Sequence, residues 1–265
     1  MMEQSKETAI LFARLDDLCG VAMQGQPAAT PFLSPCELHF SQKYLNFRVG
    51  TSGFISWGGY EGAERKRIFI LPEYIEAPIE YGSLLEYGFE DSFAAIEVRG
   101  SGYKKLSHRD FLGSVLGLGL ERSVIGDVVV FDEEKPRAVI FCDKAVAEFI
   151  CESLLKVGSD NVRTASVSVC DVKIPEKKFL HITDTVASER LDGVVSALLS
   201  LSRERAKELV LDGAVELDYE RCERPDKVVS SPSVVTVRGY GKFRINSLSE
   251  KTKKGRLRLD ADKYV

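Results

Sequence analysis

The chain has 265 residues, of which 44% are hydrophobic and 29% are charged, and its formal net charge is −4. This composition is typical of a globular protein with room for two or three small domains. It excludes an integral membrane protein, because no apolar run approaches the roughly 20 residues of a membrane-spanning helix. Residues 1–7 lack the features of a signal peptide, so we expect a cytoplasmic location.

The six cysteines carry no metal or redox signature. None of them lies at the close spacing of a zinc site or of a thiol redox pair. Cys142 and Cys151 fall within apolar segments and are predicted to be small core residues. The sequence therefore predicts no bound metal and no cofactor.

The first 62 residues are predicted to form a helical region that ends in a glycine-rich loop. Apolar residues recur at helical spacing from Ile10 onward, which predicts a helix within residues 1–30. A second helix is expected to begin after Ser34 and to end near Asn46, because Ser34 and Glu37 have the spacing of a capping box. Residues 50–62 contain five glycines and are predicted to be a loop.

Residues 63–172 are predicted to form a ferredoxin-like domain. A short strand is expected at 67–71, and the β-α-β-β-α-β order of the domain begins after it. The strands expected after it are at 93–98, 127–131, 137–141 and 162–169, and the helices are at 107–118 and 144–156. The order β-α-β-β-α-β predicts a four-stranded antiparallel sheet with both helices on one face. The fold class is therefore α+β, and residues 173–187 are predicted to be a linker.

Positive charge is concentrated in the last third of the chain. Residues 1–187 hold 20 basic and 27 acidic side chains, a net of −7, whereas residues 188–265 hold 16 and 13, a net of +3. The local field, rather than the total charge, attracts a polyanion such as RNA. Residues 188–245 are predicted to form two short helices and a small sheet, and residues 246–265 a mobile basic tail.

The C-terminal segments resemble the RNA-binding module typified by small-subunit ribosomal protein four. The resemblance is carried by Arg190-Leu191-Asp192, Ser202-Arg203-Glu204-Arg205-Ala206-Lys207-Glu208-Leu209, Asp212-Gly213-Ala214-Val215 and Val237-Arg238-Gly239-Tyr240-Gly241-Lys242-Phe243-Arg244. In that family the helix pair holds a phosphate backbone. Asp218-Tyr219 and Ser231-Pro232 depart from the family's Asn-Gly and Gly-Asp, which leaves the hairpin geometry open.

The resemblance implies a set of RNA-binding residues on the helix pair and at the end of the sheet. Arginine and lysine supply charge-assisted hydrogen bonds to phosphate, and a capping serine can add a hydroxyl group or helix N-terminal amides. The implied residues are Arg190, Ser202, Arg203, Lys207, Arg238, Lys242 and Arg244. The alternative is that these are ordinary solvated charges. Asp192 is expected to lie near a helix N-terminus or to pair with an arginine.

Two central motif groups, taken with this module, resemble the YlmH family of bacterial RNA-binding proteins over about residues 30–245. They are Gly58-Gly59-Tyr60-Glu61-Gly62-Ala63-Glu64-Arg65-Lys66-Arg67, and Leu106-Ser107-His108-Arg109-Asp110-Phe111-Leu112-Gly113 with the segments at 116–122 and 126–127. The resemblance implies a non-catalytic, ribosome-associated protein that binds structured RNA, either rRNA or tRNA. Relatives in ribosome quality control engage large subunits carrying peptidyl-tRNA, and members are linked to cell-division gene clusters.

The central motifs also offer candidates for a second RNA contact. These are Arg65, Lys66 and Arg67, which lead into a strand, and His108 and Arg109 at a helix start. The alternatives are a solvated cluster at a strand edge and a capping role for the residues around His108. Trp57 and Tyr60 are aromatic residues in a loop, and they either stack on an unpaired base or pack on their own domain.

Enzymatic readings find little support in the sequence. His108-Arg109-Asp110 imitates a kinase catalytic loop, but a kinase needs an asparagine five residues after the aspartate and Val115 stands there. We therefore predict no catalytic residue. Two other hypotheses stay open, namely an RNA-modifying enzyme with its site among His108, Asp110 and Glu64, and a scaffold that docks a protein partner through the N-terminal part.

Overall fold

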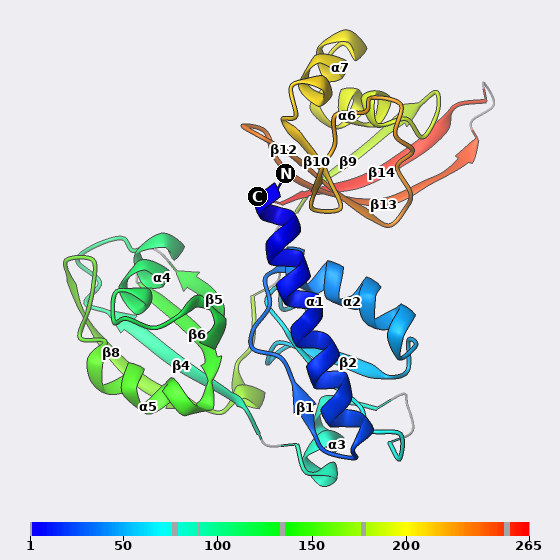
Figure 1. Cartoon of the computed structure of the whole chain (residues 1–265). Coiled ribbons are helices and arrows are strands. Elements are labelled where there is room, and N and C mark those ends of the chain that lie inside the picture. The colour runs from blue at the N-terminus through cyan, green and yellow to red at the C-terminus, as the bar shows by residue number, and fades with distance from the viewer. Residues whose placement is uncertain are drawn as a thin grey trace. The chain divides into compact units, whose positions relative to one another are not determined.

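The computed structural model describes residues 2–75, 79–89, 91–132, 136–175, 179–251 and 255–264. The chain divides into two compact units, Met1–Pro175 and Glu176–Val265 (Figure 1). The helices are α1 (Met2–Met23), α2 (Pro35–Arg48), α3 (Tyr81–Leu84), α4 (His108–Leu116), α5 (Lys144–Ser153), α6 (Leu191–Leu199) and α7 (Arg203–Leu211). Within the described residues, none of them has the length and apolar character needed to cross a membrane.

The strands belong to three separate antiparallel sheets. Those of the first unit are β1 (Ala28–Ala29), β2 (Phe54–Trp57), β3 (Arg67–Ile70), β4 (Phe93–Gly100), β5 (Ile125–Asp132), β6 (Arg137–Asp143), β7 (Lys156–Val157) and β8 (Asp160–Val167). Those of the second unit are β9 (Phe179–Val186), β10 (Val215–Leu217), β11 (Glu220–Arg221), β12 (Ser233–Val237), β13 (Gly241–Lys251) and β14 (Leu257–Tyr264).

The N-terminal region packs α1 and α2 against the sheet β1-β3-β2, around a core that includes Leu15, Leu45 and Ile68. The predicted capping box at the start of α2 is confirmed. The amide of Ser34 donates to the Glu37 carboxylate at 2.7 Å, and the Ser34 hydroxyl accepts from the Glu37 amide at 3.3 Å. Both bonds satisfy amides that a helix start otherwise leaves without partners.

The sequence had predicted that the whole glycine-rich segment is a loop, but part of it forms a strand. Residues Phe54–Trp57 form β2, which pairs with β3 from Phe54↔Ile70 to Trp57↔Arg67. The predicted boundary between residues 62 and 63 therefore falls between two paired strands. The strand was missed because it is short, uniformly half-buried and stabilised by a partner outside the local pattern.

The ferredoxin-like arrangement is confirmed. The sheet order is β5-β6-β4-β8-β7, and all its pairs are antiparallel, with β7 as an additional short edge strand. Both α4 and α5 pack on one face, where Phe111 and Ile150 join Ile96 and Ile140 in a single core. Ser107 begins α4, and its amide and hydroxyl donate to the Asp110 carboxylate at 2.8 and 2.7 Å.

The other face of this sheet is covered by the glycine-rich motif. The Asp127 carboxylate accepts from the Tyr60 hydroxyl at 2.7 Å and from the amides of Glu64 and Arg65 at 2.7 and 3.0 Å. Gly59 has a φ of +97°, and a Cβ there would lie 2.7 Å from the Phe141 ring. Only glycine allows so close an approach at that backbone angle. This face is therefore closed at its centre by Tyr60 and its neighbours.

The guanidinium of Arg65 ties the N-terminal region to the central sheet. It donates to the backbone carbonyls of Phe32 at 2.9 Å, Arg122 at 3.0 Å and Ile125 at 3.0 Å. Burial lowers the pKa of the neighbouring Arg122 to about 10, and repulsion from Arg65 acts in the same direction. Both groups stay charged at neutral pH, so these carbonyls receive charge-assisted hydrogen bonds.

In the second unit, α6 and α7 cover one face of the sheet β11-β10-β12-β13-β14-β9. Two predictions are corrected here. The expected linker contains β9, and the expected basic tail contains the end of β13 and all of β14, which pairs with β9 from Tyr264↔Phe179 to Leu257↔Val186. The many charged residues of this segment predicted a mobile tail. In the structure Leu259 and Ala261 point into the core, and the charged residues that alternate with them lie on the other face of the sheet.

The hairpin between β10 and β11 closes despite its departure from the family's Asn-Gly. Asp218 and Tyr219 both have positive φ, 50° and 67°, as a two-residue turn of this hand requires. The Asp218 carboxylate accepts from the Val234 amide at 2.8 Å, which fixes the turn against β12.

We predict that Arg65→Ala lowers the free energy of unfolding by about 3 kcal/mol, because three charge-assisted hydrogen bonds to backbone carbonyls are lost. Chemical denaturation followed by circular dichroism measures this loss. Arg14→Ala is the matched control, since Arg14 is exposed on α1, and it should leave stability nearly unchanged. Equal effects of the two substitutions would contradict the structural role of Arg65.

Candidate nucleic-acid interface

The centre of the candidate site is the buried carboxylate of Asp192, in the first turn of α6. The start of this helix is held by residues 225–229, because the amides of Leu191 and Asp192 donate to the carbonyls of Lys227 at 2.9 Å and Pro225 at 3.0 Å. The Asp192 side chain is only 4% exposed. A carboxylate so far removed from water requires partners of opposite charge.

Arg190 and Arg203 are those partners. Arg190 pairs with the Asp192 carboxylate at 3.0 Å and Arg203 at 3.3 Å, so the two arginines meet although they begin different helices. Their side chains are 41% and 55% exposed. Each guanidinium has five donor hydrogens, so the edges turned away from Asp192 can bind a phosphate oxygen. The two arginines together outweigh the carboxylate by one positive charge.

The pairing also lowers the pKa of Asp192. Burial raises the pKa of this carboxyl, but hydrogen bonds from Arg190 and Arg203 more than offset it and place the pKa below its ordinary value. Asp192 is therefore ionised at neutral pH and holds both guanidinium groups in place. The sequence had predicted that Asp192 lies near a helix N-terminus or pairs with an arginine; it does both, and two arginines share it.

Ser202 and Lys207 lie on α7 beside this pair. The Ser202 hydroxyl accepts from the Arg205 amide at 3.2 Å as the helix cap, and its own hydrogen remains available to an acceptor. Lys207 is exposed one turn after Arg203, on the same face of the helix. The structure thus brings together the start of α6, the start of α7 and the first exposed turn of α7.

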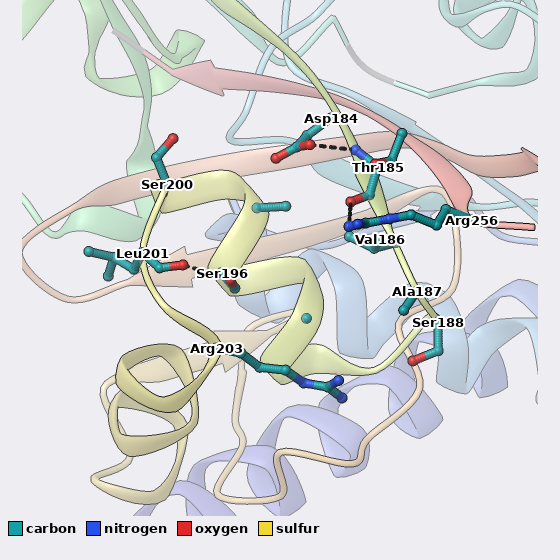
Figure 2. A pocket seen from close by; sticks show the side chains of 12 residues that line it. Asp184, Thr185, Val186, Ala187, Ser188, Ser196, Ser200, Leu201, Arg203 and Arg256 are labelled. Atoms are coloured by element: carbon teal, nitrogen blue, oxygen red, sulfur yellow. Dashed lines mark hydrogen bonds between the residues drawn. The ribbon is translucent and has the colours of Figure 1, made fainter. Parts of the chain in front are cut away.

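A polar cleft of about 450 Å³ opens next to Arg203 (Figure 2). It lies between the end of β9 and α6, and Figure 2 shows Arg203 and Arg256 reaching it from different segments. Arg256 donates to the Thr185 carbonyl at 2.6 Å. The sequence analysis missed Arg256, because it stood within a run of charges that predicted a mobile tail.

Two of the predicted residues lie on another face of the sheet. Lys242 and Arg244 alternate with core residues of β13 and lie on the sheet face opposite the helices. The Arg244 guanidinium pairs with Asp262 at 2.7 Å, and the Lys242 ammonium lies 5.1 Å from the centre of the Tyr264 ring. Arg238 is exposed in the turn between β12 and β13.

The predicted second contact at residues 65–67 does not have the exposed character that RNA binding requires. Arg65 is engaged by three carbonyls, and Arg67, 13% exposed, pairs with Asp143 at 3.0 Å and donates to the Thr30 carbonyl at 2.7 Å. Lys66 is half-buried and forms a backbone bridge with Leu33. Arginine in this motif thus serves structure, since its fork satisfies backbone oxygens where the chain crosses between sheets.

The two aromatic candidates of the glycine-rich segment also pack internally. Tyr60 is 8% exposed and bonds Asp127, and Trp57 stacks on Tyr81 with ring centres 6.2 Å apart. In contrast, His108 and Arg109 are exposed in the first turn of α4. Among the described residues, no group of acidic, histidine and cysteine side chains has the arrangement of a metal site.

Comparison with known proteins matches the chain to the models of one protein family. Residues 85–171 match the family model described as "Putative RNA-binding domain in YlmH", and residues 10–75 match "YlmH, N-terminal". The chain is 31% identical over 234 residues to "Ribosome-associated protein quality control protein P2" of Bacillus subtilis (strain 168), which spans 87% of this chain and 84% of the relative.

The chain belongs to the YlmH family. Among solved structures it is similar to "Cell division protein ylmH from Streptococcus pneumoniae", with a TM-score of 0.49 and 19% identity, over 65% of this chain and 95% of that one. The YlmH models match the N-terminal region and the ferredoxin-like domain, which are the parts joined by Asp127 and Arg65.

We predict that Asp192→Asn lowers the free energy of unfolding by about 2 kcal/mol near neutral pH, because a neutral amide cannot pair with two guanidinium groups. Folding lowers the pKa of Asp192, so its stabilising effect is complete above the unfolded-state pKa of about 3.9 and is lost as pH falls through the lower folded-state value. The difference in the free energy of unfolding between the wild type and the variant should therefore become smaller in acid.

Urea denaturation, repeated from neutral pH into acid, measures this difference in the free energy of unfolding. Asp17→Asn serves as the control, because Asp17 is exposed on α1 in the first unit. That variant should match the wild type at every pH. A difference for Asp192→Asn that does not change with pH would contradict the role assigned to its charge.

Proposed function

We propose that this YlmH-family protein binds structured RNA through the surface of α6 and α7, without chemical conversion of the RNA. The observation that carries the proposal is the pairing of Arg190 and Arg203 on one buried carboxylate. The pairing fixes the two forks before any ligand arrives, so little side-chain entropy is lost when a phosphate binds. Lys207 adds a third cation on the same side of α7.

Membership of the YlmH family supports RNA as the ligand, and one relative bears a name that includes "ribosome-associated". We therefore propose rRNA or tRNA within the ribosome as the partner, which gives the protein a cytoplasmic place of action. Binding to large subunits that carry peptidyl-tRNA is the more specific form of this proposal. The likeness of α6 and α7 to the module of small-subunit ribosomal protein four points to a bent phosphate backbone as the target.

The site on the helix pair is tested with Arg203→Ala combined with Lys207→Ala. We expect the affinity for ribosomal RNA to fall at least about tenfold, since two charge-assisted contacts are lost. The slope of log affinity against log salt should become shallower by about 1.5, as expected for two fewer phosphate contacts. Filter binding at several salt concentrations measures both quantities.

The matched control is Arg205→Ala combined with Arg221→Ala. It also removes two positive charges from the second unit, but these arginines pair with Glu208 and Glu223 away from Asp192. This control should bind nearly as the wild type does. Arg190 stays on Asp192 in the test variant, so its melting temperature should fall by only a few degrees. Unchanged RNA affinity in the test variant would remove the helix pair as the site.

Association with the ribosome is tested by sedimentation of cell extracts through sucrose. We expect the protein to migrate with ribosomal particles at low salt and to leave them at high salt, because phosphate contacts are screened. The Arg203 and Lys207 variant should stay near the top of the gradient. A protein that keeps its sedimentation after ribonuclease treatment would instead indicate a protein scaffold.

A further inference from the structure

The loop between β4 and α4 presents an aromatic ring to solvent. Tyr103 is 93% exposed, the largest exposed fraction among the large hydrophobic side chains of the described residues. A ring in water forgoes the stabilisation that burial of its apolar surface would give. The same unit buries Tyr60 and stacks Trp57 on Tyr81, whereas the ring of Tyr103 stays in solvent.

The base of this loop is rigid although its tip is exposed. The buried carboxylate of Asp160 accepts from the Ser101 amide at 2.9 Å and from the Ser101 hydroxyl at 2.5 Å. The Ser101 hydroxyl oxygen also accepts from the Tyr103 amide at 3.3 Å. Gly102 has a φ of +85°, which turns the chain so that Tyr103 follows directly outside the sheet. The ring is therefore held out by fixed backbone.

Basic residues follow Tyr103 along the chain. Residues 101–109 contain Lys104, Lys105, His108 and Arg109 and no acidic residue. The Lys104 ammonium donates to the Ser159 hydroxyl, and its charge lowers the pKa of the neighbouring Asp160 carboxyl. The nearest acid along the chain, Asp110, is occupied by the amide and hydroxyl of Ser107. An exposed ring among cations is the arrangement that binds an unpaired base and its phosphates.

The usual alternative surface on a sheet of this kind is closed. Ferredoxin-like RNA binders of the RRM type stack bases on aromatic residues of the central strands. Here the outward residues of β6, Val139 and Phe141, are 2% and 0% exposed, because Tyr60 and Ala63 pack on them. A base cannot reach that part of the sheet. The loop that follows β4 instead presents an exposed ring next to basic residues.

We infer that residues 101–109 form a second RNA contact, in which Tyr103 stacks on an unpaired base while Lys104 and Arg109 hold the adjoining phosphates. The inference rests on the proposed RNA-binding function and assigns to this loop the recognition of single-stranded nucleotides next to a structured element. It replaces the contact expected at residues 65–67, whose arginines are engaged within the fold.

The experiment uses the full chain with two RNA probes, a blunt hairpin and the same hairpin with a short single-stranded tail. We expect Tyr103→Ala to weaken binding of the tailed hairpin about tenfold, the loss of one stacked base, and to leave the blunt hairpin unaffected. Tyr103→Phe keeps the ring and should bind both probes as the wild type does. Thermal melting should be the same for all three proteins, since Tyr103 makes no core contact.

A second measurement reports stacking directly. In Tyr103→Trp, the fluorescence of the new indole should be quenched by the tailed hairpin and not by the blunt one, against the constant signal of Trp57 in the wild type. If Tyr103→Ala binds both probes like the wild type while the Arg203 and Lys207 variant has lost them, the loop is not an RNA contact and the proposed function stands. If the wild type binds neither probe nor ribosomal RNA, the proposed function itself is wrong.

Discussion

The candidate site depends on the cost of burying one carboxylate. Asp192 is removed from water at the start of α6, and it is stable there only because Arg190 and Arg203 both pair with it. This requirement fixes the start of α7 against the start of α6. It also holds two guanidinium groups that would repel each other if the carboxylate were absent. The outer edges of these groups can attract a phosphate. The buried Asp192 carboxylate therefore positions a cationic surface without being part of it.

The same device recurs in the first unit with a different result. Asp127 accepts three hydrogen bonds from the glycine-rich motif, and Arg65 extends the connection to three carbonyls in two further segments. Here the hydrogen-bonding groups of Asp127 and Arg65 are engaged by other parts of the fold and do not face a ligand. The contrast explains why two arginine-containing motifs that look alike in the sequence have different uses. What separates them is the number of donor hydrogens left facing solvent.

Several parts of this architecture follow from local signals. The capping boxes at Ser34 and Ser107, the β-α-β-β-α-β order and the starts of α6 and α7 were all predicted, because each depends on residues within a few positions of one another. The helix-pair residues Arg190, Arg203 and Lys207 were named for the same reason. Their use in RNA binding remains a prediction that the experiments above address.

Other features were decided only by tertiary structure. The strand Phe54–Trp57 exists because β3 pairs with it, and β9 and β14 join one sheet although about 70 residues separate them along the chain. Arg65 and Arg190 are both arginines beside a helix or strand start, yet one is enclosed by carbonyls and the other reaches solvent. The sequence by itself determined the capped helix starts, the β-α-β-β-α-β order and the concentration of positive charge toward the C-terminus. Pairing between distant segments, and the burial it produces, decided which charges stay at the surface, because desolvation depends on neighbours that local spacing does not specify.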